Sequence, residues 1–397
     1  MSRLSNILVF FSISMGMLFG IHYYIWARLV RDTSLPAPYR QLSTALLIAL
    51  GASMPLTFIV GRVAGRDAAR WLNWPAFVWM GLMAFLFLSL IGGDVVRLAL
   101  FLGKHASTRG APAAPLDPER RLLLGRLFGA LTAAVAGSLG VVALREGLKR
   151  VELKRLEISL GRLPRALDGF SIVQLTDVHI GPTIGKTFLD DVVTRTNAVA
   201  PDLIVITGDL VDGSVASLRE MVAPLARLKA KHGVYFVTGN HEYYAGVEEW
   251  MVELGRLGVR VLRNERVIVG DGANSFDLAG IDDHSSHGSA PGHGPDLSRA
   301  LEGRDPAREL VLLAHQPKAI HEAEKNGVGL QLSGHTHGGQ IWPWNYLVKL
   351  QQPYIAGLAR QGGTQLYVSR GTGYWGPPMR LGAPAEVTHI ILRAPRT

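Results

Sequence analysis

The chain has 397 residues, 48% of them apolar, with a formal net charge of +9 and no cysteine. Its length and apolarity exceed those of one ordinary soluble domain, so at least two unlike parts are expected. The absence of cysteine excludes disulfide frameworks, thiol nucleophiles, iron–sulfur centres and cysteine-based zinc sites, which leaves His, Asp, Glu and Asn as metal ligands.

The basic excess lies in the N-terminal part of the chain. Residues 1–165 hold 20 Lys and Arg against 8 Asp and Glu, whereas residues 166–397 hold 21 against 24. Basic residues that flank apolar segments are typical of membrane proteins. We therefore expect the lipid bilayer as a partner and do not expect nucleic acid.

Four N-terminal segments predict transmembrane helices. A helix needs about 20 apolar residues to cross a ~30 Å hydrocarbon layer. Charged residues are missing from the middle of the four segments, since Arg28 and Arg126 both lie near a segment end. Because ion paths need polar groups inside the membrane, we interpret the helices as an anchor. The segments are Ile7–Leu29, Leu42–Val60, Trp74–Ile91 and Leu122–Leu144.

The side of the membrane on which the C-terminal part lies is weakly indicated. Basic residues near the segment ends are equally numerous on both sides, so their distribution gives no orientation. The pair Arg120-Arg121, before the last apolar segment, resembles a twin-arginine export signal. We therefore expect a multi-pass protein of the cytoplasmic (inner) membrane, with a slight lean to an extracytoplasmic C-terminal part.

A change of pattern marks the domain organisation. We predict a membrane domain over 1–148, a connector over 149–165 and a soluble domain over 166–397. Apolar and polar residues alternate between Val151 and Leu160, so the connector also predicts the first strand of the soluble domain.

From Phe170 onward, short apolar runs each end in residues that can bind a metal. Helix-like stretches at 187–198 and 217–231 separate the first runs, so the pattern predicts βαβ units. Open α/β sheets bind ligands at the carboxyl ends of their strands. The five runs begin at Ser171, Leu203, Val234, Leu310 and Leu330, and the residues after them are Asp177, His179, Asp209, Asp212, Asn240, His241, His315, His335 and His337.

These residue types suit a centre with two divalent ions. Two ions about 3.5 to 4 Å apart need a bridging carboxylate together with neutral imidazole and amide ligands. Asp209 is the best candidate for the bridge, because it follows Gly208 at a strand end. Glycine also precedes Asn240 and His335, where it lets the backbone turn sharply and approach the metals.

Three other patterns carry less weight. Gly371-x-Gly373-x-x-Gly376 matches a dinucleotide fingerprint, but the following Pro377-Pro378 forbids the helix that the fingerprint needs. Neither His241-Glu242 nor His321-Glu322 continues into HExxH. The Gly/Ser/Pro-rich stretch 282–295 contains three irregularly spaced histidines and predicts a flexible loop rather than a further metal site.

Five blocks together resemble the calcineurin-like metallophosphoesterase superfamily. They are Asp177-x-His179, Gly208-Asp209-x-x-Asp212, Gly239-Asn240-His241-Glu242, His315 and Gly334-His335-x-His337. Details such as Ser369-Arg-Gly-Thr-Gly-Tyr-Trp-Gly376 are similar to the bacterial YkuE/YaeI-type branch, which includes a chlamydial type of UDP-2,3-diacylglucosamine hydrolase of lipid A synthesis. The resemblance covers roughly residues 166–393 and fills every motif position.

The resemblance implies an α/β fold, a four-layer α/β/β/α sandwich preceded by about four transmembrane helices. It implies two divalent ions, for which Mn, Fe and Zn are all suitable. His241 would lie near the leaving-group oxygen, with Asp212 orienting it. One ion would be held by Asp177, His179, Asp209 and His337, and the other by Asp209, Asn240, His315 and His335.

The leading hypothesis is a membrane-anchored phosphohydrolase that cleaves a phosphodiester or pyrophosphate by attack of a metal-activated water. Aromatic residues at 341–346 and 374–375, together with the membrane helices, favour a lipid-linked or UDP-sugar substrate. Arg370 and Arg380 are candidate phosphate partners, with surface ion pairing as the alternative. A phosphomonoesterase or phosphoprotein phosphatase remains an alternative, as does a non-catalytic membrane sensor or scaffold. The oligomeric state is left open.

Overall fold

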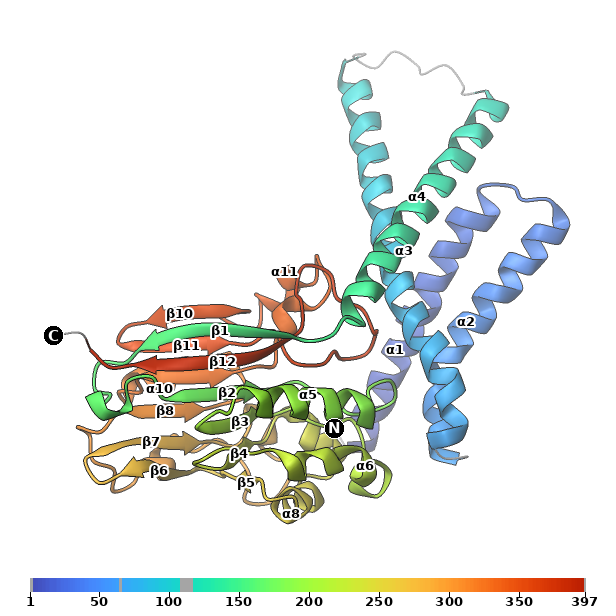
Figure 1. Cartoon of the computed structure of the whole chain (residues 1–397). Helices are drawn as coiled ribbons and strands as arrows, with labels where there is room; N and C mark the ends of the chain where they lie inside the picture. Colours follow the sequence, from blue (N-terminus) through green and yellow to red (C-terminus); the bar gives the residue numbers. More distant parts are fainter. Residues whose placement is uncertain (1–2, 64–65, 108–116, 396–397) are drawn as a thin grey trace. The chain divides into compact units, whose positions relative to one another are not determined.

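The chain forms two compact units, which Figure 1 shows in the colours of the sequence. The computed structural model describes residues 3–63, 66–107 and 117–395. The helical unit comprises Met1–Arg145 and Gly376–Pro378, and the two-sheet unit comprises Glu146–Trp375 and Met379–Thr397.

The first sheet of the two-sheet unit has six strands in the order β1-β12-β2-β3-β4-β5. β2 to β5 run parallel, as expected for strands joined through helices, whereas β12 is antiparallel to β2 and parallel to β1. The strands are β1 (Glu152–Ser159), β2 (Ser171–Leu175), β3 (Leu203–Thr207), β4 (Val234–Val237), β5 (Arg260–Val261) and β12 (Glu386–Arg393). The helices between them are α5 (Lys186–Ala198), α6 (Val215–Val222), α7 (Asn240–Ala245) and α8 (Val247–Arg256).

The second sheet also has six strands, in the order β10-β11-β9-β8-β7-β6. Its central strands are parallel, while the β6–β7 and β10–β11 hairpins at its edges are antiparallel. The strands are β6 (Glu265–Asp271), β7 (Asn274–Gly280), β8 (Leu310–Leu313), β9 (Leu330–Ser333), β10 (Gly357–Gln361) and β11 (Thr364–Val368). The associated helices are α9 (Leu297–Ala300), α10 (Ile320–Lys325) and α11 (Asn345–Val348).

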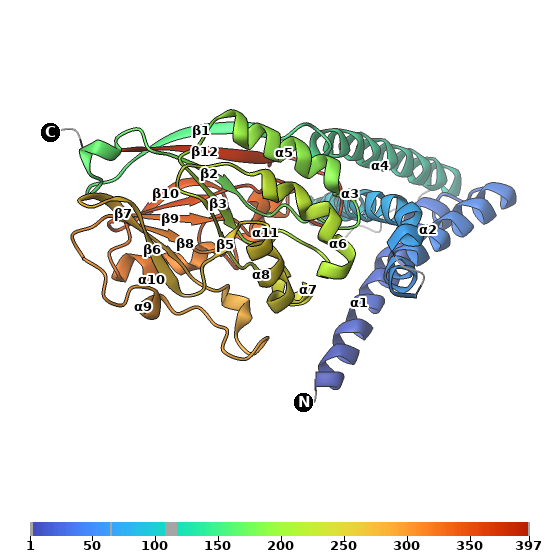
Figure 2. The same ribbon diagram turned by 60° about the horizontal axis from the view of Figure 1, so that its bottom comes forward.

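The two sheets face each other and carry helices on their outer faces, as Figure 2 shows. Side chains of a strand alternate between the two faces of its sheet. In β8, Val311 and Leu313 accordingly pack toward the first sheet, and Leu310 and Leu312 pack toward α9 and α10. The opposite face of the first sheet is buried under α5, α6 and α8. The predicted four-layer α/β/β/α sandwich is therefore confirmed.

The five strands predicted to carry the site, β2, β3, β4, β8 and β9, are all present. The predicted helix over 187–198 matches α5. The predicted helix over 217–231 is shorter, because α6 ends at Val222 and a 3₁₀ turn with Pro224 near its start follows. β1 lies inside the segment 149–165 that the sequence presented as a connector, and it pairs with β12 along its whole length. The Gly371-to-Gly376 pattern forms a loop without a helix.

The helical unit consists of α1 (Arg3–Trp26), a π-helical turn (Ala27–Arg31), α2 (Ala37–Val63), α3 (Arg66–Ser107) and α4 (Pro118–Gly147). Three stretches of the described residues are long and apolar enough to cross a membrane: Ala37–Gly61, Trp71–Lys104 and Pro118–Gly147. They correspond to the second, third and fourth predicted segments. The first segment, Ile7–Leu29, forms most of α1 and the start of the π-helical turn and is not among them. The expected number of about four is thus corrected to about three.

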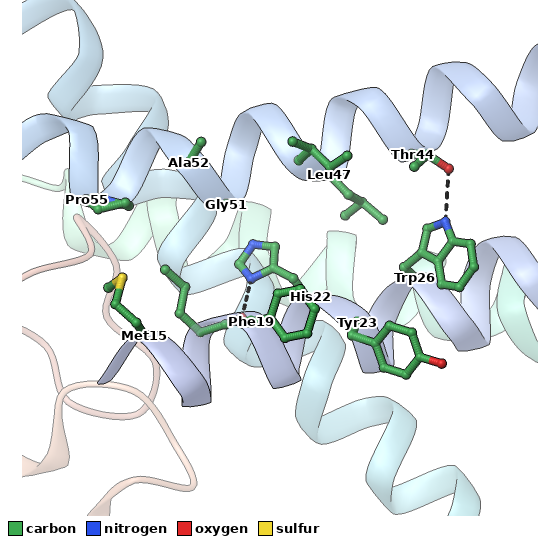
Figure 3. A pocket seen from close by; sticks show the side chains of 12 residues that line it. Met15, Phe19, His22, Tyr23, Trp26, Thr44, Leu47, Gly51, Ala52 and Pro55 are labelled. Carbon is green, nitrogen blue, oxygen red and sulfur yellow. Dashed lines mark hydrogen bonds between the residues drawn. The ribbon is translucent and has the colours of Figure 1, made fainter. Parts of the chain in front are cut away.

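Polar contacts join α1 to its neighbours. The Trp26 indole nitrogen donates to the Thr44 hydroxyl at 2.9 Å, between α1 and α2 (Figure 3). The third predicted segment ended at Ile91, but α3 continues and includes Asp94. The Asp94 carboxylate accepts from the Tyr24 hydroxyl at 2.6 Å and from Arg28 at 2.7 Å. This pairing lets a charged residue lie within a long apolar helix.

Candidate metal centre

The carboxyl ends of five strands carry the predicted site residues. β2, β3 and β4 are neighbours in the first sheet, and β8 and β9 are neighbours in the second. Short loops after these strands hold Asp177, Asp209, Asn240, His315 and His335. Because both sheets direct the same ends of their parallel strands to one region, ligands distant in the sequence meet there.

Several site residues have an unusual backbone conformation. The φ angle is 51° at Asp177, 52° at His179, 50° at Asp209, 72° at His335 and 49° at His337. A left-handed conformation costs a non-glycine residue on the order of 1 to 3 kcal/mol, and such strain collects at functional sites. The fold therefore accepts strain in order to aim these side chains at one point.

The glycines before the site residues allow the loops to touch. A Cβ atom at Gly239 would lie 2.1 Å from Asp209 Oδ1, and one at Gly334 would lie 2.1 Å from Asp177 Oδ2. At Gly208 it would lie 2.7 Å from His315 Nδ1. These separations are far inside van der Waals contact, so a side chain at any of the three positions would collide with the neighbouring loop.

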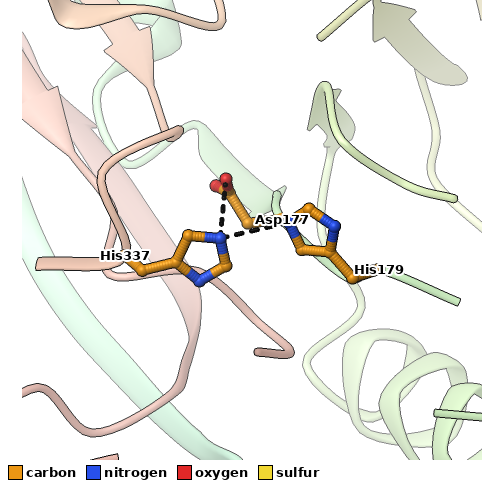
Figure 4. A group of neighbouring side chains, drawn as sticks. All are labelled: Asp177, His179 and His337. Carbon is orange, nitrogen blue, oxygen red and sulfur yellow. Dashed lines mark hydrogen bonds and ion pairs between the residues drawn. The ribbon is translucent and has the colours of Figure 1, made fainter. Parts of the chain in front are cut away.

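The first ligand group consists of Asp177, His179 and His337, which Figure 4 shows as sticks. The Nε2 atoms of His179 and His337 lie 3.1 Å apart, and His337 Nε2 is 3.4 Å from Asp177 Oδ1. All three residues are buried. The three side chains come from the loops after β2 and β9, that is, from both sheets.

The second ligand group consists of Asp209, His315 and His335. His315 Nε2 lies 3.1 Å from Asp209 Oδ2 and 3.2 Å from His335 Nδ1. The Nδ1 atom of His315 donates to the Thr207 carbonyl at 2.7 Å, which leaves the Nε2 lone pair free for a metal. Asp209 Oδ2 is also 3.9 Å from His179 Nε2, so Asp209 connects the second group to the first.

Asp212 lies between two histidines and orients both. Its Oδ1 atom is 2.9 Å from His179 Nδ1 and 2.7 Å from His241 Nδ1. The bond directs His179 Nε2 toward the first group, as a carboxylate behind a metal-binding histidine does. Burial opposes the charge of Asp212, but His179 outweighs it and lowers the pKa of Asp212 to about 2. Asp212, His179 and His241 form a third group that could hold a metal.

The metal affinity of the centre is expected to depend on pH. Burial alone would lower the pKa of His179, but the carboxylates of Asp212, Asp209 and Asp177 raise it to about 9. Below that pH a metal must displace the imidazole proton, so affinity is lost as the pH falls. We expect the apparent affinity for Mn²⁺ to fall at least about tenfold per pH unit between pH 9 and pH 7. Titration calorimetry of the metal-free protein at several pH values measures this affinity. An affinity for Mn²⁺ that does not change with pH would contradict the prediction.

Glu242 belongs to the site, although no role was predicted for it. Its buried carboxylate accepts backbone N–H groups of Gly239 at 2.7 Å, Leu210 at 2.8 Å and Asp209 at 3.0 Å. It therefore ties the loop after β3 to the start of α7. Glu242 is the last residue of the Gly-Asn-His-Glu block, and this position was the available signal. The block does not indicate which loop the Glu242 carboxylate binds.

The two arginines considered as phosphate partners differ in their surroundings. Arg380 is fully buried and donates to the carbonyls of Ala383 at 2.7 Å, Arg370 at 2.9 Å and Gly373 at 3.0 Å. The N–H groups of its guanidinium are thus occupied by backbone carbonyls, so the prediction that Arg380 contacts a phosphate was wrong. Arg370 is half-buried and pairs with Glu386 at 3.4 Å.

The histidines of the 282–295 stretch do not form a metal site among the residues that the structure describes. His293 is instead buried, with Nδ1 3.0 Å from the Tyr243 hydroxyl and Nε2 2.7 Å from Glu248. His284 lies in a 3₁₀ turn that Asp283 caps through the Ser285 N–H. The stretch is therefore fixed against α7 and α8 at His293, which its composition did not predict.

Comparisons with known proteins agree with this geometry. Residues 170–339 match the calcineurin-like phosphoesterase family. A "Transmembrane protein with metallophosphoesterase domain" of Bos taurus is 43% identical over 296 residues, which cover 72% of this chain and 66% of the bovine protein. The Danio rerio protein of the same description is 35% identical over 388 residues, or 93% of this chain and 86% of that protein. YkuE of Bacillus subtilis, an uncharacterized metallophosphoesterase, is 32% identical over 289 residues, or 70% and 98%.

Two conclusions follow from these matches. The resemblance to the family and to YkuE is confirmed. The three long apolar helices and the relatives described as transmembrane indicate a membrane protein.

Proposed function

We propose that this chain, which belongs to the calcineurin-like metallophosphoesterase family and is a metal-dependent phosphoesterase, cleaves a phosphodiester or pyrophosphate with the help of two divalent ions. The observation that carries the proposal is the position of Asp209. Its Oδ2 atom lies 3.1 Å from His315, 3.9 Å from His179 and 3.9 Å from His241, so it faces both ligand groups and the adjacent histidine.

The side chains present fit two ions. Asn240 Oδ1 is buried without a hydrogen-bond partner among the described residues, as expected for an atom reserved for a ligand. Nitrogen and oxygen donors suit Mn, Fe and Zn. The chemistry that such ions supply is to lower the pKa of a water molecule, so that it can attack phosphorus, and to polarise the phosphoryl oxygens. We assign Asp177, His179, Asp209 and His337 to one ion and Asp209, Asn240, His315 and His335 to the other.

His241 is the proton donor to the leaving-group oxygen in this proposal. Its side chain is partly exposed, and Asp212 holds its Nδ1 atom, so Nε2 faces the centre. Burial alone would lower the pKa of His241, but the hydrogen bond to Asp212 and the charge of Asp209 raise it. A raised pKa keeps the imidazole protonated near neutral pH, as a general acid requires. Asp212 acts through His241 and His179 and is a positioning residue.

Exposed aromatic side chains support a substrate with a large apolar or planar group. The rings of Tyr244 and Trp375 lie 5.4 Å and 5.7 Å from the His241 ring, and 74% and 56% of these residues are exposed. Further along the loop after His337, Trp342, Trp344 and Tyr346 are also exposed. Exposed aromatics in a membrane protein suit the bilayer interface. We therefore propose a lipid-linked substrate, such as a UDP-sugar lipid, at the membrane surface.

Comparison of two aryl esters tests the reaction class. We expect the detergent-purified full chain with Mn²⁺ to hydrolyse bis(4-nitrophenyl) phosphate with a kcat/KM at least about tenfold above that for 4-nitrophenyl phosphate. The reverse preference would support a phosphomonoesterase or phosphoprotein phosphatase. Hydrolysis of neither ester by metal-loaded protein would indicate strict lipid specificity. Failure to bind metal would support the non-catalytic sensor or scaffold.

The membrane side of the centre can be tested separately. We propose the cytoplasmic (inner) membrane with an extracytoplasmic centre, on the ground of Arg120-Arg121 before the last span. Alkaline phosphatase fused after Thr397 is expected to be active, since it matures only outside the cytoplasm. An inactive fusion that is well expressed would mean that the candidate metal centre lies on the cytoplasmic side of the membrane.

A further inference from the structure

An apolar groove runs along α1 in the helical unit. One cavity of about 530 Å³ lies between α1 and α2, and another of about 590 Å³ lies between α1, α2 and α3. Met15, Leu18 and Pro55 line both cavities, so the two are neighbours along α1. The lining from Phe11 to Trp26 spans 16 residues of α1, and the 15 steps between them cover about 22 Å at the helical rise of 1.5 Å per residue. One acyl chain of a lipid leaflet, ~15 Å deep, fits along this length.

The wall of the groove is held in place by hydrogen bonds. His22 Nδ1 donates to the Leu18 carbonyl at 2.8 Å, and His22 Nε2 accepts from the Trp79 indole at 2.9 Å. Both ring nitrogens are therefore used, and the ring orientation is fixed. A Cβ atom at Gly51 would lie 3.0 Å from the His22 ring, so glycine allows α2 to pack closely there. The groove is preformed rather than produced by mobile side chains.

The groove ends in a hollow whose lining includes two arginines. A third cavity of about 450 Å³ is lined by Trp26, Arg31, Ser34, Leu35 and Arg40. Trp26 lines both this hollow and the groove, and its indole nitrogen donates to Thr44. The hollow lies beside Ala37, where the first candidate span begins, and therefore at the level of the lipid headgroups.

Positive charge prevails in this hollow. Arg31 pairs with Asp32 at 3.0 Å, but Asp32 is shared with Arg28 at 3.1 Å. The Arg40 guanidinium makes no hydrogen bond or ion pair with any residue in the described ranges. The first turn of α2 contains no acidic residue, so its N-terminal end adds to the positive potential. An arginine-lined hollow of this kind matches a phosphate group.

We propose that the groove and the hollow together bind one anionic glycerophospholipid, with an acyl chain along α1 and the phosphate between Arg31 and Arg40. Charge complementarity selects the headgroup, and the apolar lining along α1 selects the chain. The groove and the hollow meet at Trp26. This site is independent of the proposed phosphoesterase reaction.

Native mass spectrometry of the delipidated full chain in non-ionic detergent tests the site. With added phosphatidylglycerol, we expect one retained lipid, bound about tenfold more tightly than phosphatidylcholine. Replacement of Arg31 and Arg40 by Gln is expected to lower the affinity for phosphatidylglycerol to that for phosphatidylcholine. Ala52→Trp, which fills the groove, is expected to remove both lipids from the site. The matched control replaces the exposed Arg120 and Arg121 by Gln and is expected to bind like the unmodified chain.

Three results would overturn the proposal. Equal retention of the two lipids by the unmodified chain would mean that the hollow does not select the headgroup. An equal loss in the Arg120/Arg121 control would indicate general charge attraction. Displacement of the lipid by millimolar inorganic phosphate, with no effect of Ala52→Trp, would indicate a site for a soluble anion. Unchanged elution and circular dichroism establish that each variant is folded, and Arg40→Gln alone serves if the double variant is not.

Discussion

Asp209→Asn is expected to lower kcat/KM for an aryl phosphodiester by a factor on the order of 10⁴, or about 5.5 kcal/mol of transition-state stabilisation. The Asp209 carboxylate is the side chain that faces both ligand groups, 3.1 Å from His315 and 3.9 Å from His179. An amide is nearly the same size but carries no charge and only one acceptor oxygen. The variant therefore keeps the shape of the site and loses the bridge between its two halves.

Metal content distinguishes loss of the bridge from loss of the fold. We expect inductively coupled plasma mass spectrometry to find two ions per chain in the unmodified protein and at most one in Asp209→Asn. Asp190→Asn is a matched control, because Asp190 lies on α5 and pairs with Lys186 at 3.2 Å outside the site. The control is expected to retain activity and metal. Full activity with two ions in Asp209→Asn would refute the assignment of the bridge.

The candidate metal ligands that the structure brings together could be picked out from the sequence because their strands are buried on both faces. Leu203–Thr207 is apolar except at its end, and Gly208 and Asp209 follow at once. Each strand end and its candidate ligand are then adjacent in the chain. Five strand ends that each carry such a residue together indicate a metal centre. The order of the layers was implied by the resemblance to the metallophosphoesterase superfamily, since apolar runs buried on both faces are equally compatible with helices on both sides of one sheet.

The supporting residues could not be predicted, because their roles depend on which loops meet. Glu242 accepts three N–H groups from two loops, and Arg380 donates to carbonyls of a loop that winds around it. Such residues have the same types as surface residues, and only the tertiary structure distinguishes them. The same holds for β12, whose neighbours β1 and β2 are both more than two hundred residues earlier.

The membrane helices show a similar limit. The third segment was expected to end at Ile91, three residues before Asp94. In the structure, Asp94 pairs with Arg28 of the π-helical turn after α1, so α3 continues as a helix far beyond it. The partner of a charged residue, which decides whether it can lie in a membrane helix, is not visible in a local window.

His241→Ala is expected to lower kcat about 10² to 10³-fold for a phosphodiester with an alkyl leaving group. The reason is that an alkoxide needs a proton as it leaves, and His241 presents Nε2 to the centre while Asp212 holds Nδ1 at 2.7 Å. A 4-nitrophenolate leaves readily without a proton, so we expect the loss for that ester to stay below about tenfold. His321→Ala, an exposed histidine on α10, is the matched control and is expected to have no effect.

Asp212→Asn tests whether the carboxylate acts through His241. We expect a similar loss of kcat for the alkyl ester in Asp212→Asn. The Asp212→Asn, His241→Ala double variant is expected to have a kcat little below that of His241→Ala alone, because both changes disable the same proton donor. The acidic side chain also orients His179 at 2.9 Å, so a moderate fall in metal affinity is expected in Asp212→Asn but not in His241→Ala. Equal losses of kcat for alkyl and aryl esters in His241→Ala would mean that His241 stabilises the transition state without donating a proton. Additive losses in the double variant would mean that Asp212 contributes mainly through His179.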